Sequence, residues 1–209
     1  MRAIDLLDRV SRELQDETRV RWTLEELARY TDAGQIYICS KAPHILSEWR
    51  TLTLAEGSRQ AVPADCLGVL EIARNADGQR RAITQVARDD MNAMAPGWGN
   101  ERTAGEIYHY VQDAREPMFF EVYPPAKPGV RVHALMARRP TSVGVSATGD
   151  VALPDEWIES LRHYVLYRAW SMDAEFASNA QIAAAHLQAC NEALGVQPAR
   201  PLTIEDPSR

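Results

Sequence analysis

Apolar residues recur every three or four positions in the first 40 residues, which predicts two amphipathic helices. The first helix is expected over residues 2–15. The second is expected to begin at Thr23, because Glu26 stands at the spacing of a capping box and Trp22 is in the position of a hydrophobic staple. Pro43 cannot continue this helix, so we expect it to end before that residue.

The period of the apolar pattern changes from about 3.6 to 2 after residue 48, which is typical of β-strands. Strands are expected at Trp49–Leu54, Leu67–Ala73, Ile83–Val86, Ile107–Val111, Met118–Tyr123 and Val130–Met136. Because the last three strands are joined by short, turn-like connections, we expect them to form an antiparallel meander. The small residues of 141–152 indicate a linker that leaves this domain.

The helical period returns after Pro154, which stands before two acids that favour the first turn of a helix. A last helix is expected to end at Gly195. The pattern as a whole predicts an α+β fold. We expect an α-helical bundle built from residues 1–45 and 153–195, an inserted antiparallel β domain at 46–152, and an extended C-terminal tail at 196–209.

The net charge of −6 is spread unevenly along the chain. Residues 153–195 carry two basic and six acidic side chains, and no segment shows the basic stripe of a protein that grips nucleic acid. There is also no apolar run long enough for a transmembrane helix and no secretory signal at the amino terminus, so no membrane partner is expected.

Motifs of catalysis and cofactor binding are missing from the sequence. There is no phosphate-binding or dinucleotide-binding glycine pattern, and the three cysteines lack metal-site spacing, so we expect buried free thiols. Glu159 and His163 share one helix face, but a second such pair is needed to complete a metal site. Neighbouring acids occur at 25–26, 89–90 and 155–156, where they suit helix starts. We therefore expect no enzyme, no cofactor and no metal, and instead a structural or assembly protein.

An ordered set of short motifs resembles one family of phage proteins. The motifs are, in order, Trp22–Leu27, Trp49–Leu54, the run from Gly57 to Asp65 with Gln60 and Pro63, Leu70–Asn75, Val86–Arg88 with Pro96-Gly97-Trp98, Val122–Pro125, Leu153–Trp157 with Tyr167-Arg168-Ala169, and Asp173-Ala174-Glu175 followed by Asn179. Because the motifs occur in this order, the chain resembles the phage head-to-tail adaptor proteins, the family that includes tail tubular protein A of short-tailed phages. The resemblance covers about residues 2–195. The tail at 196–209 carries no motif of this family.

The resemblance implies a virion structural protein that is assembled in the bacterial host cytoplasm and located at the head–tail junction. It implies a homo-oligomeric ring, a dodecamer in that family, between the portal protein and a tail nozzle like tail tubular protein B. Genomic DNA would pass through the ring as cargo during ejection. The family requires neither catalytic residues nor a cofactor.

Two sets of residues are the expected functional positions of such a ring. Asp155, Glu156 and Glu159 are expected to face the channel, where negative charge would repel DNA and let it pass. The carboxyl tail is expected to order on docking to the portal, through Pro198, Arg200, Pro201, Leu202 and Ile204.

Two other functions are compatible with the sequence. One is a cell-wall glycan hydrolase carried in the tail, which would use a pair of carboxylates. The other is a neck or tail-completion protein at another position in the particle.

Overall fold

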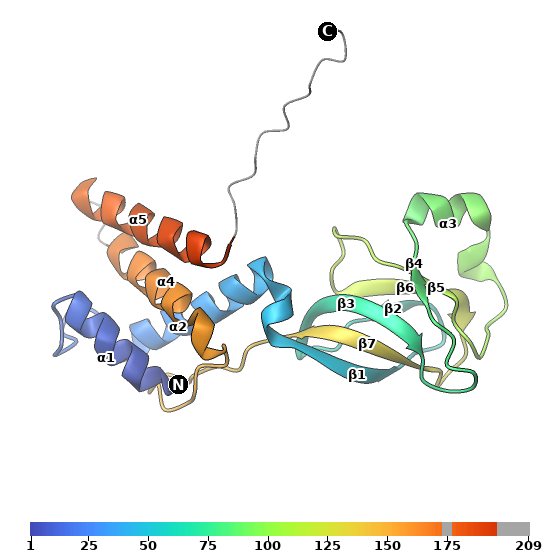
Figure 1. The fold of residues 1–209 in the computed structure, drawn as a ribbon, viewed down its shortest axis with the longest axis horizontal. Coiled ribbons are helices and arrows are strands. Elements are labelled where there is room, and N and C mark those ends of the chain that lie inside the picture. The colour runs from blue at the N-terminus through green and yellow to red at the C-terminus, as the bar shows by residue number, and fades with distance from the viewer. Residues whose placement is uncertain (173–176, 196–209) are drawn as a thin grey trace, which may run out of the picture. The chain divides into compact units, whose positions relative to one another are not determined.

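The computed structural model describes residues 1–172 and 177–195, and it confirms the α+β fold (Figure 1). The chain forms two compact units. The helical unit contains Met1–Lys41 and the residues from Thr141 onward, and the β unit contains Ala42–Pro140.

The helical unit is built from four α-helices. They are α1 (Ala3–Glu13), α2 (Leu24–Lys41), α4 (Ile158–Ser171) and α5 (Ala177–Ala193), with the short 3₁₀ helix η3 (Asp155–Trp157) leading into α4. The capping box before α2 is confirmed, because the Glu26 backbone N–H donates to Thr23 Oγ1 over 3.2 Å and the Thr23 N–H donates to Glu26 Oε2 over 3.1 Å. Helix α2 ends two residues before Pro43, as its sequence predicts.

Helices α2 and α4 approach each other closely at Gly34. A Cβ atom at this position would lie 2.6 Å from Leu161 Cδ1 and 2.8 Å from Tyr164 Cδ1, so a larger residue fits only if these two side chains of α4 shift. Near the start of α2, the Trp22 indole N–H donates to the Ala169 carbonyl over 3.2 Å. Trp22 therefore joins the entry of α2 to the end of α4.

The segment 141–152 packs in the helical unit, which differs from the expectation of a linker that belongs to the β domain. Its two ends are held by Gln35, a fully buried side chain of α2. The Gln35 Nε2 group donates to the Thr141 carbonyl over 3.2 Å, and Gln35 Oε1 accepts from the Ala152 N–H over 2.6 Å. Asp32, one turn earlier in α2, accepts from the Val143 N–H over 2.8 Å.

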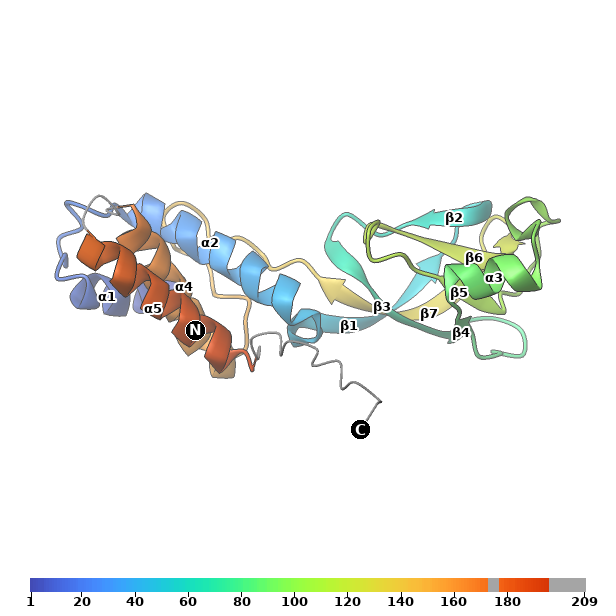
Figure 2. The ribbon, with the colours of Figure 1, turned by 90° about the horizontal axis from the view of Figure 1, so that it is seen from above.

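The β unit contains two sheets that face each other as layers (Figures 1 and 2). Sheet β1-β7-β3 is formed by β1 (Ser47–Thr53), β7 (Arg131–Arg138) and β3 (Cys66–Asn75), and sheet β2-β6-β5-β4 by β2 (Gly57–Ala61), β6 (Phe119–Ala126), β5 (His109–Val111) and β4 (Thr84–Gln85). All pairings are antiparallel except that of β4 with β5. Apolar side chains from both sheets form one core between them.

The expected meander of the last three strands is wrong for β7. Strands β5 and β6 pair as expected, but β7 pairs with β1 and β3 in the other sheet. The connection after β6 therefore crosses from one sheet to the other. Strand β2 is absent from the strands expected from the sequence, because its buried side chain is the polar Gln60. Gln60 accepts from the Ala55 N–H and donates to the Ala55 and Gly57 carbonyls.

Short helices complete the β unit. The 3₁₀ helix η1 (Pro43–Leu46) leads into β1, and α3 (Arg88–Met94) and the 3₁₀ helix η2 (Trp98–Asn100) lie between β4 and β5. Met91 of α3 and Trp98 of η2 pack with Val111 of β5 in a second, smaller core. Helix α3 has Asp89 and Asp90 in its first turn, where neighbouring acids are expected from the sequence.

Candidate functional site

The three acids that were expected to face a channel lie together at the start of α4. Asp155 and Glu156 belong to η3 and are exposed, and the Asp155 side chain is 89% accessible. Glu159 differs from them, because its carboxylate accepts from Arg162 Nε over 2.8 Å. Arg162 also pairs with Glu13 of α1. The charge of Glu159 is thus partly balanced. The more exposed negative charge rests on Glu156 and on Asp155, whose ion-pair partner among the described residues is the Met1 amino group at 3.7 Å.

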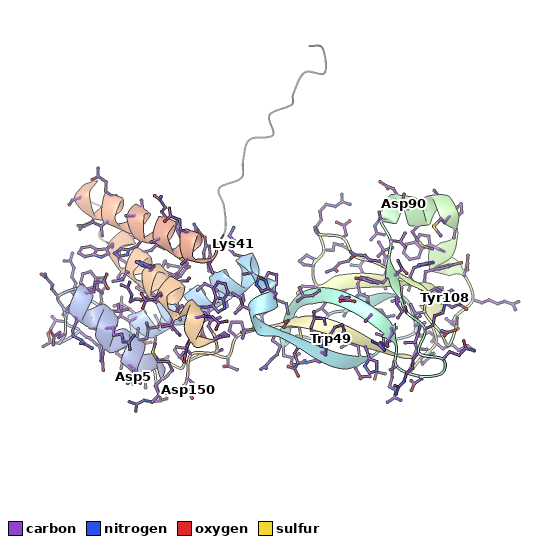
Figure 3. The ribbon with its side chains drawn as sticks, viewed as in Figure 1. Asp5, Lys41, Trp49, Asp90, Tyr108 and Asp150 are labelled. Carbon is purple, nitrogen blue, oxygen red and sulfur yellow. The ribbon has the colours of Figure 1, made fainter. Side chains whose placement is uncertain are left out.

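Two further acids lie beside Asp155, around the first two residues of the chain. The Met1 amino group is 3.7 Å from Asp155 Oδ1, and Arg2 forms an isolated β-bridge with Asp150. The Arg2 guanidinium donates to both carboxylate oxygens of Asp5, at 2.9 and 3.1 Å, and this raises the pKa of Arg2. Asp5 and Asp150 lie at the same end of the helical unit (Figure 3).

We call Asp5, Asp150, Asp155 and Glu156 the acidic cluster. Its first two members were not expected from the sequence, because Asp5 belongs to the first helix, far from the others in the chain, and Asp150 stands in the segment expected to be a linker. No local pattern indicates such a cluster. The expected portal-docking residues Pro198, Arg200, Pro201, Leu202 and Ile204 lie outside the described residues.

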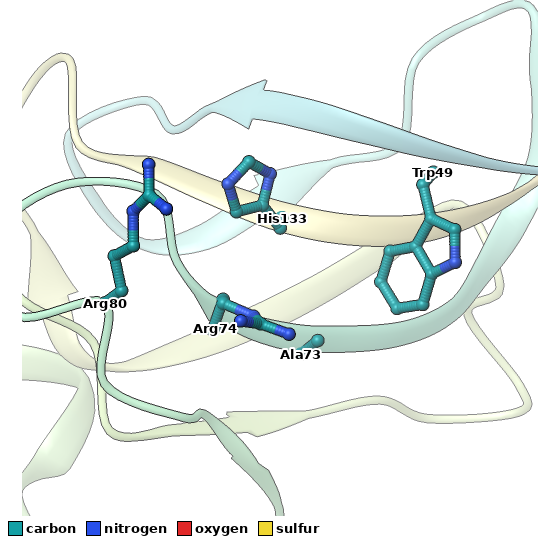
Figure 4. A pocket seen from close by; sticks show the side chains of 5 residues that line it. All are labelled: Trp49, Ala73, Arg74, Arg80 and His133. Atoms are coloured by element: carbon teal, nitrogen blue, oxygen red, sulfur yellow. The ribbon is translucent and has the colours of Figure 1, made fainter.

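The outer face of sheet β1-β7-β3 carries a shallow hollow of about 280 Å³. Its lining residues are Trp49, Ala73, Arg74, Arg80 and His133 (Figure 4). Trp49 is 56% exposed, which is high for a large aromatic side chain. The sequence predicts the strand that contains Trp49, but the face on which the indole lies follows from the sheet pairing, where Trp49 faces Leu135 of β7.

The three cysteines are free and buried, as the sequence predicts. Burial raises the pKa of the Cys39 and Cys190 thiols to about 11, and it also raises the pKa of Cys66. A thiol with a raised pKa holds little thiolate at neutral pH and is a poor nucleophile. The described part of the chain holds no group of three or more His, Cys, Asp or Glu side chains arranged for a metal ion.

His163 pairs across the helix interface, and its partner is not the Glu159 that the helical spacing suggested. Its Nδ1 lies 2.9 Å from Nδ1 of His186 in α5, so one imidazole donates and the other accepts. The adjacent groups are Arg162, 3.3 Å from His163 Nε2, and the carboxylates of Glu13 and Glu159. Burial lowers the pKa of both histidines, and Arg162 lowers that of His163 further.

The histidine pair predicts that the helical unit loses stability in mild acid. The unfolded chain takes up these protons near the ordinary histidine pKa of about 6.5, whereas the folded chain takes them up only at lower pH. The stabilisation is therefore present above pH 6.5 and is lost as the pH falls toward the lowered values. Urea unfolding monitored by the helical circular dichroism signal, between pH 8 and pH 5, measures the loss. His186→Gln should reduce this loss of unfolding free energy, whereas His44→Gln, a histidine outside the pair, should not. If the unfolding free energy falls equally with pH in the parent chain and in both variants, the histidine pair is not the cause.

Comparison with known proteins gives one result that covers nearly the whole chain. A family model described as SU10 adaptor protein matches residues 1–206. No curated protein matches the chain. Within the described residues, no helix combines the length and the apolar composition needed to cross a bilayer.

Proposed function

The chain belongs to the SU10 adaptor protein family, a family of phage structural proteins, and on that premise we propose that it forms a ring between the portal and the tail nozzle. The family places the protein in the virion, in contact with other virion components, and points to a structural protein and not to an enzyme. The ring, its dodecameric state and the likeness to tail tubular protein A are parts of the proposal. The family match over residues 1–206 is the observation that carries it.

The chemistry of the described residues supports a protein that acts by contact. The thiols are buried with raised pKa values, and the neighbouring acids at 25 and 26 have separate structural partners, Arg29 and the Thr23 cap. A glycosidase needs two carboxylates that converge on one bond, and these two do not. The function is therefore proposed to rest on surfaces that contact other copies and other virion proteins.

We propose that the acidic cluster faces the channel of the ring. Asp155 and Glu156 are exposed acids, and Asp5 and Asp150 lie beside them. DNA phosphates near such a surface are repelled, so the genome passes without binding to the wall.

Charge reversal at two of these positions tests the channel. Virions that carry Asp155→Arg with Glu156→Arg should release their DNA several-fold more slowly at low salt, because the wall then attracts phosphates, and added salt should reduce the difference. The rate of DNA release after triggered ejection is the measurement. Asp89→Arg with Asp90→Arg is the matched control, since these two exposed acids also stand in the first turn of a helix. Release at the normal rate by the first variant would contradict the channel assignment.

We also propose that the tail at 196–209 docks on the portal. Its three prolines and the apolar Leu202 and Ile204 suit a segment that binds in an extended form. Deletion of residues 197–209 should abolish capture of the chain by purified portal, and a scrambled tail of the same composition should bind weakly. Full portal binding by the truncated chain would refute this role.

A further inference from the structure

The hollow on the outer face of sheet β1-β7-β3 joins an exposed aromatic ring to positive charge. Trp49 lies on β1, His133 on the central strand β7, and Arg74 on β3, while Arg80 comes from the loop after β3 (Figure 4). The sheet register explains this grouping. Thr51, two residues after Trp49 and on the same face, lies opposite His133, and His133 lies opposite Arg74.

The arginines of the hollow differ from the other arginines of the same sheet. Arg50 pairs with Asp65, Arg131 with Asp77, and Arg138 with Glu48. Arg74 and Arg80 form no salt bridge with any residue that the structure describes. The hollow thus places two guanidinium groups that form no salt bridge with a described residue next to an indole that is 56% exposed. The nearby Asp77 carboxylate pairs with Arg131, and Arg80 contributes only a more distant attraction that lowers the pKa of Asp77. Tryptophan and arginine are the residues most enriched among the energetic centres of protein interfaces.

The β unit has no net charge, and the rest of the chain is acidic. Residues 42–140 contain twelve basic and twelve acidic side chains, so the net charge of −6 belongs entirely to the remainder of the chain. A β unit with no net charge but with two arginines in a hollow that form no salt bridge with a described residue therefore fits an acidic protein surface. The helical unit of another copy is such a surface, and away from the acidic cluster it carries other exposed carboxylates, for example those of Glu17 and Glu192.

We propose that the hollow of Trp49, Arg74 and Arg80 is an interface between copies of this chain, and that it receives the acidic helical unit of a neighbouring copy. The inference rests on the proposed function in one respect, since a ring requires each copy to contact the next. Trp49 supplies apolar contact area, and the two arginines pair with carboxylates of the neighbour and set its orientation. The contact joins two different surfaces, and such a contact generates a ring when the rotation from one copy to the next closes.

A nucleic acid is a poorer occupant of the same hollow. A groove that follows a nucleic acid backbone needs several basic side chains in a row. Here Glu71 is exposed on the same strand as Arg74, and Asp77 lies between the two arginines in the chain. These carboxylates would repel the phosphates on either side of the two arginines.

Photo-crosslinking from position 49 identifies the occupant. A benzophenone amino acid is placed at Trp49 in the full-length chain, virions are assembled and irradiated, and the crosslinked peptides are sequenced by mass spectrometry. We expect a dimer of this chain in which position 49 is joined to a peptide of residues 1–41 or 141–195. Crosslinks only to DNA, only to another virion protein, or to nothing would overturn the inference.

Charge reversal gives a second test that does not alter Trp49. Arg74→Glu with Arg80→Glu should weaken self-association of the purified chain at least about tenfold, since like charges would then face each other. Arg102→Glu with Arg139→Glu changes the net charge equally at two other exposed arginines of the β unit and should leave self-association unchanged. Equal weakening by both pairs, or by neither, would overturn the inference.

The outcomes separate this inference from the proposed function. If virions contain the chain at the head–tail junction but position 49 gives no crosslink to another copy, the inference is wrong and the function stands. If virions lack the chain, the proposed function is wrong and the interface fails with it.

Discussion

Replacing Asn75 with leucine is expected to lower the free energy of unfolding of the β unit by about 2–4 kcal/mol. Asn75 is buried, and its side chain makes three hydrogen bonds. Its Oδ1 accepts from the Ile107 N–H over 2.9 Å, and its Nδ2 donates to the carbonyls of Ile107 and Arg81 over 2.8 and 3.1 Å. Leucine would leave the Ile107 N–H and carbonyl without these partners in a buried place, whereas the Arg81 carbonyl would still accept from the backbone N–H of residue 75 over 2.9 Å.

The Asn75 prediction has an isosteric test and a matched control. Asn75→Asp keeps an acceptor for the Ile107 N–H but directs a carboxylate at two carbonyl oxygens, so it should destabilise as strongly as leucine. Asn100→Leu, at an exposed position, should change stability by less than about 0.5 kcal/mol. Urea unfolding monitored by tryptophan fluorescence measures all three variants. If Asn75→Leu behaves like Asn100→Leu, the three hydrogen bonds do not hold the β unit together.

Replacing Gln35 with leucine is expected to free the segment 141–152 from the helical unit. The fully buried Gln35 amide is the partner of the Thr141 carbonyl and of the Ala152 N–H, the two ends of that segment. Losing both bonds should cost about 2–4 kcal/mol. Amide hydrogen exchange of peptides within 141–152 should then become faster by about 30-fold to 1000-fold, at 1.4 kcal/mol for each factor of ten.

The control for Gln35 is the same substitution on an exposed helical surface. Gln181 is an exposed residue of α5, and Gln181→Leu should leave exchange in 141–152 unchanged. If amide hydrogen exchange in residues 141–152 becomes faster to the same extent in both variants, or in neither, the role assigned to Gln35 is wrong.

The elements that the sequence predicts correctly are those whose signals are local. The capping box of Thr23 and Glu26 and the stop at Pro43 use contacts within a few residues, and the structure has both. The buried face of α2 also follows the helical period of its apolar residues. These features need no knowledge of which element packs against which.

The errors come from contacts between distant parts of the chain. Strand β7 alternates as expected, but alternation does not say which sheet a strand joins. Strand β2 buries the polar Gln60, so its apolar pattern is missing. The segment 141–152 shows no period, because Gln35 and Asp32 of α2 hold its backbone through hydrogen bonds between residues more than 100 positions apart.

The candidate surfaces also combine residues that local sequence signals indicate with residues that only the fold brings together. The acids of 155 and 156 are visible in the sequence because they begin a helix, whereas Asp5 joins them only because the fold brings the first residues of the chain beside Asp150 and Asp155. The hollow around Trp49 depends on the pairing of β1 with β7 and of β7 with β3. The histidine pair joins α4 to α5, and the spacing within α4 suggests a different partner for His163.

Cryo-electron microscopy of purified virions tests the central claim most directly. The account predicts a closed ring of this chain between the portal and the tail nozzle, with Asp155 and Glu156 on the wall of its channel. Particles in which the head–tail junction is built entirely from other proteins, or in which this chain occupies a position away from the path of the DNA, would contradict it.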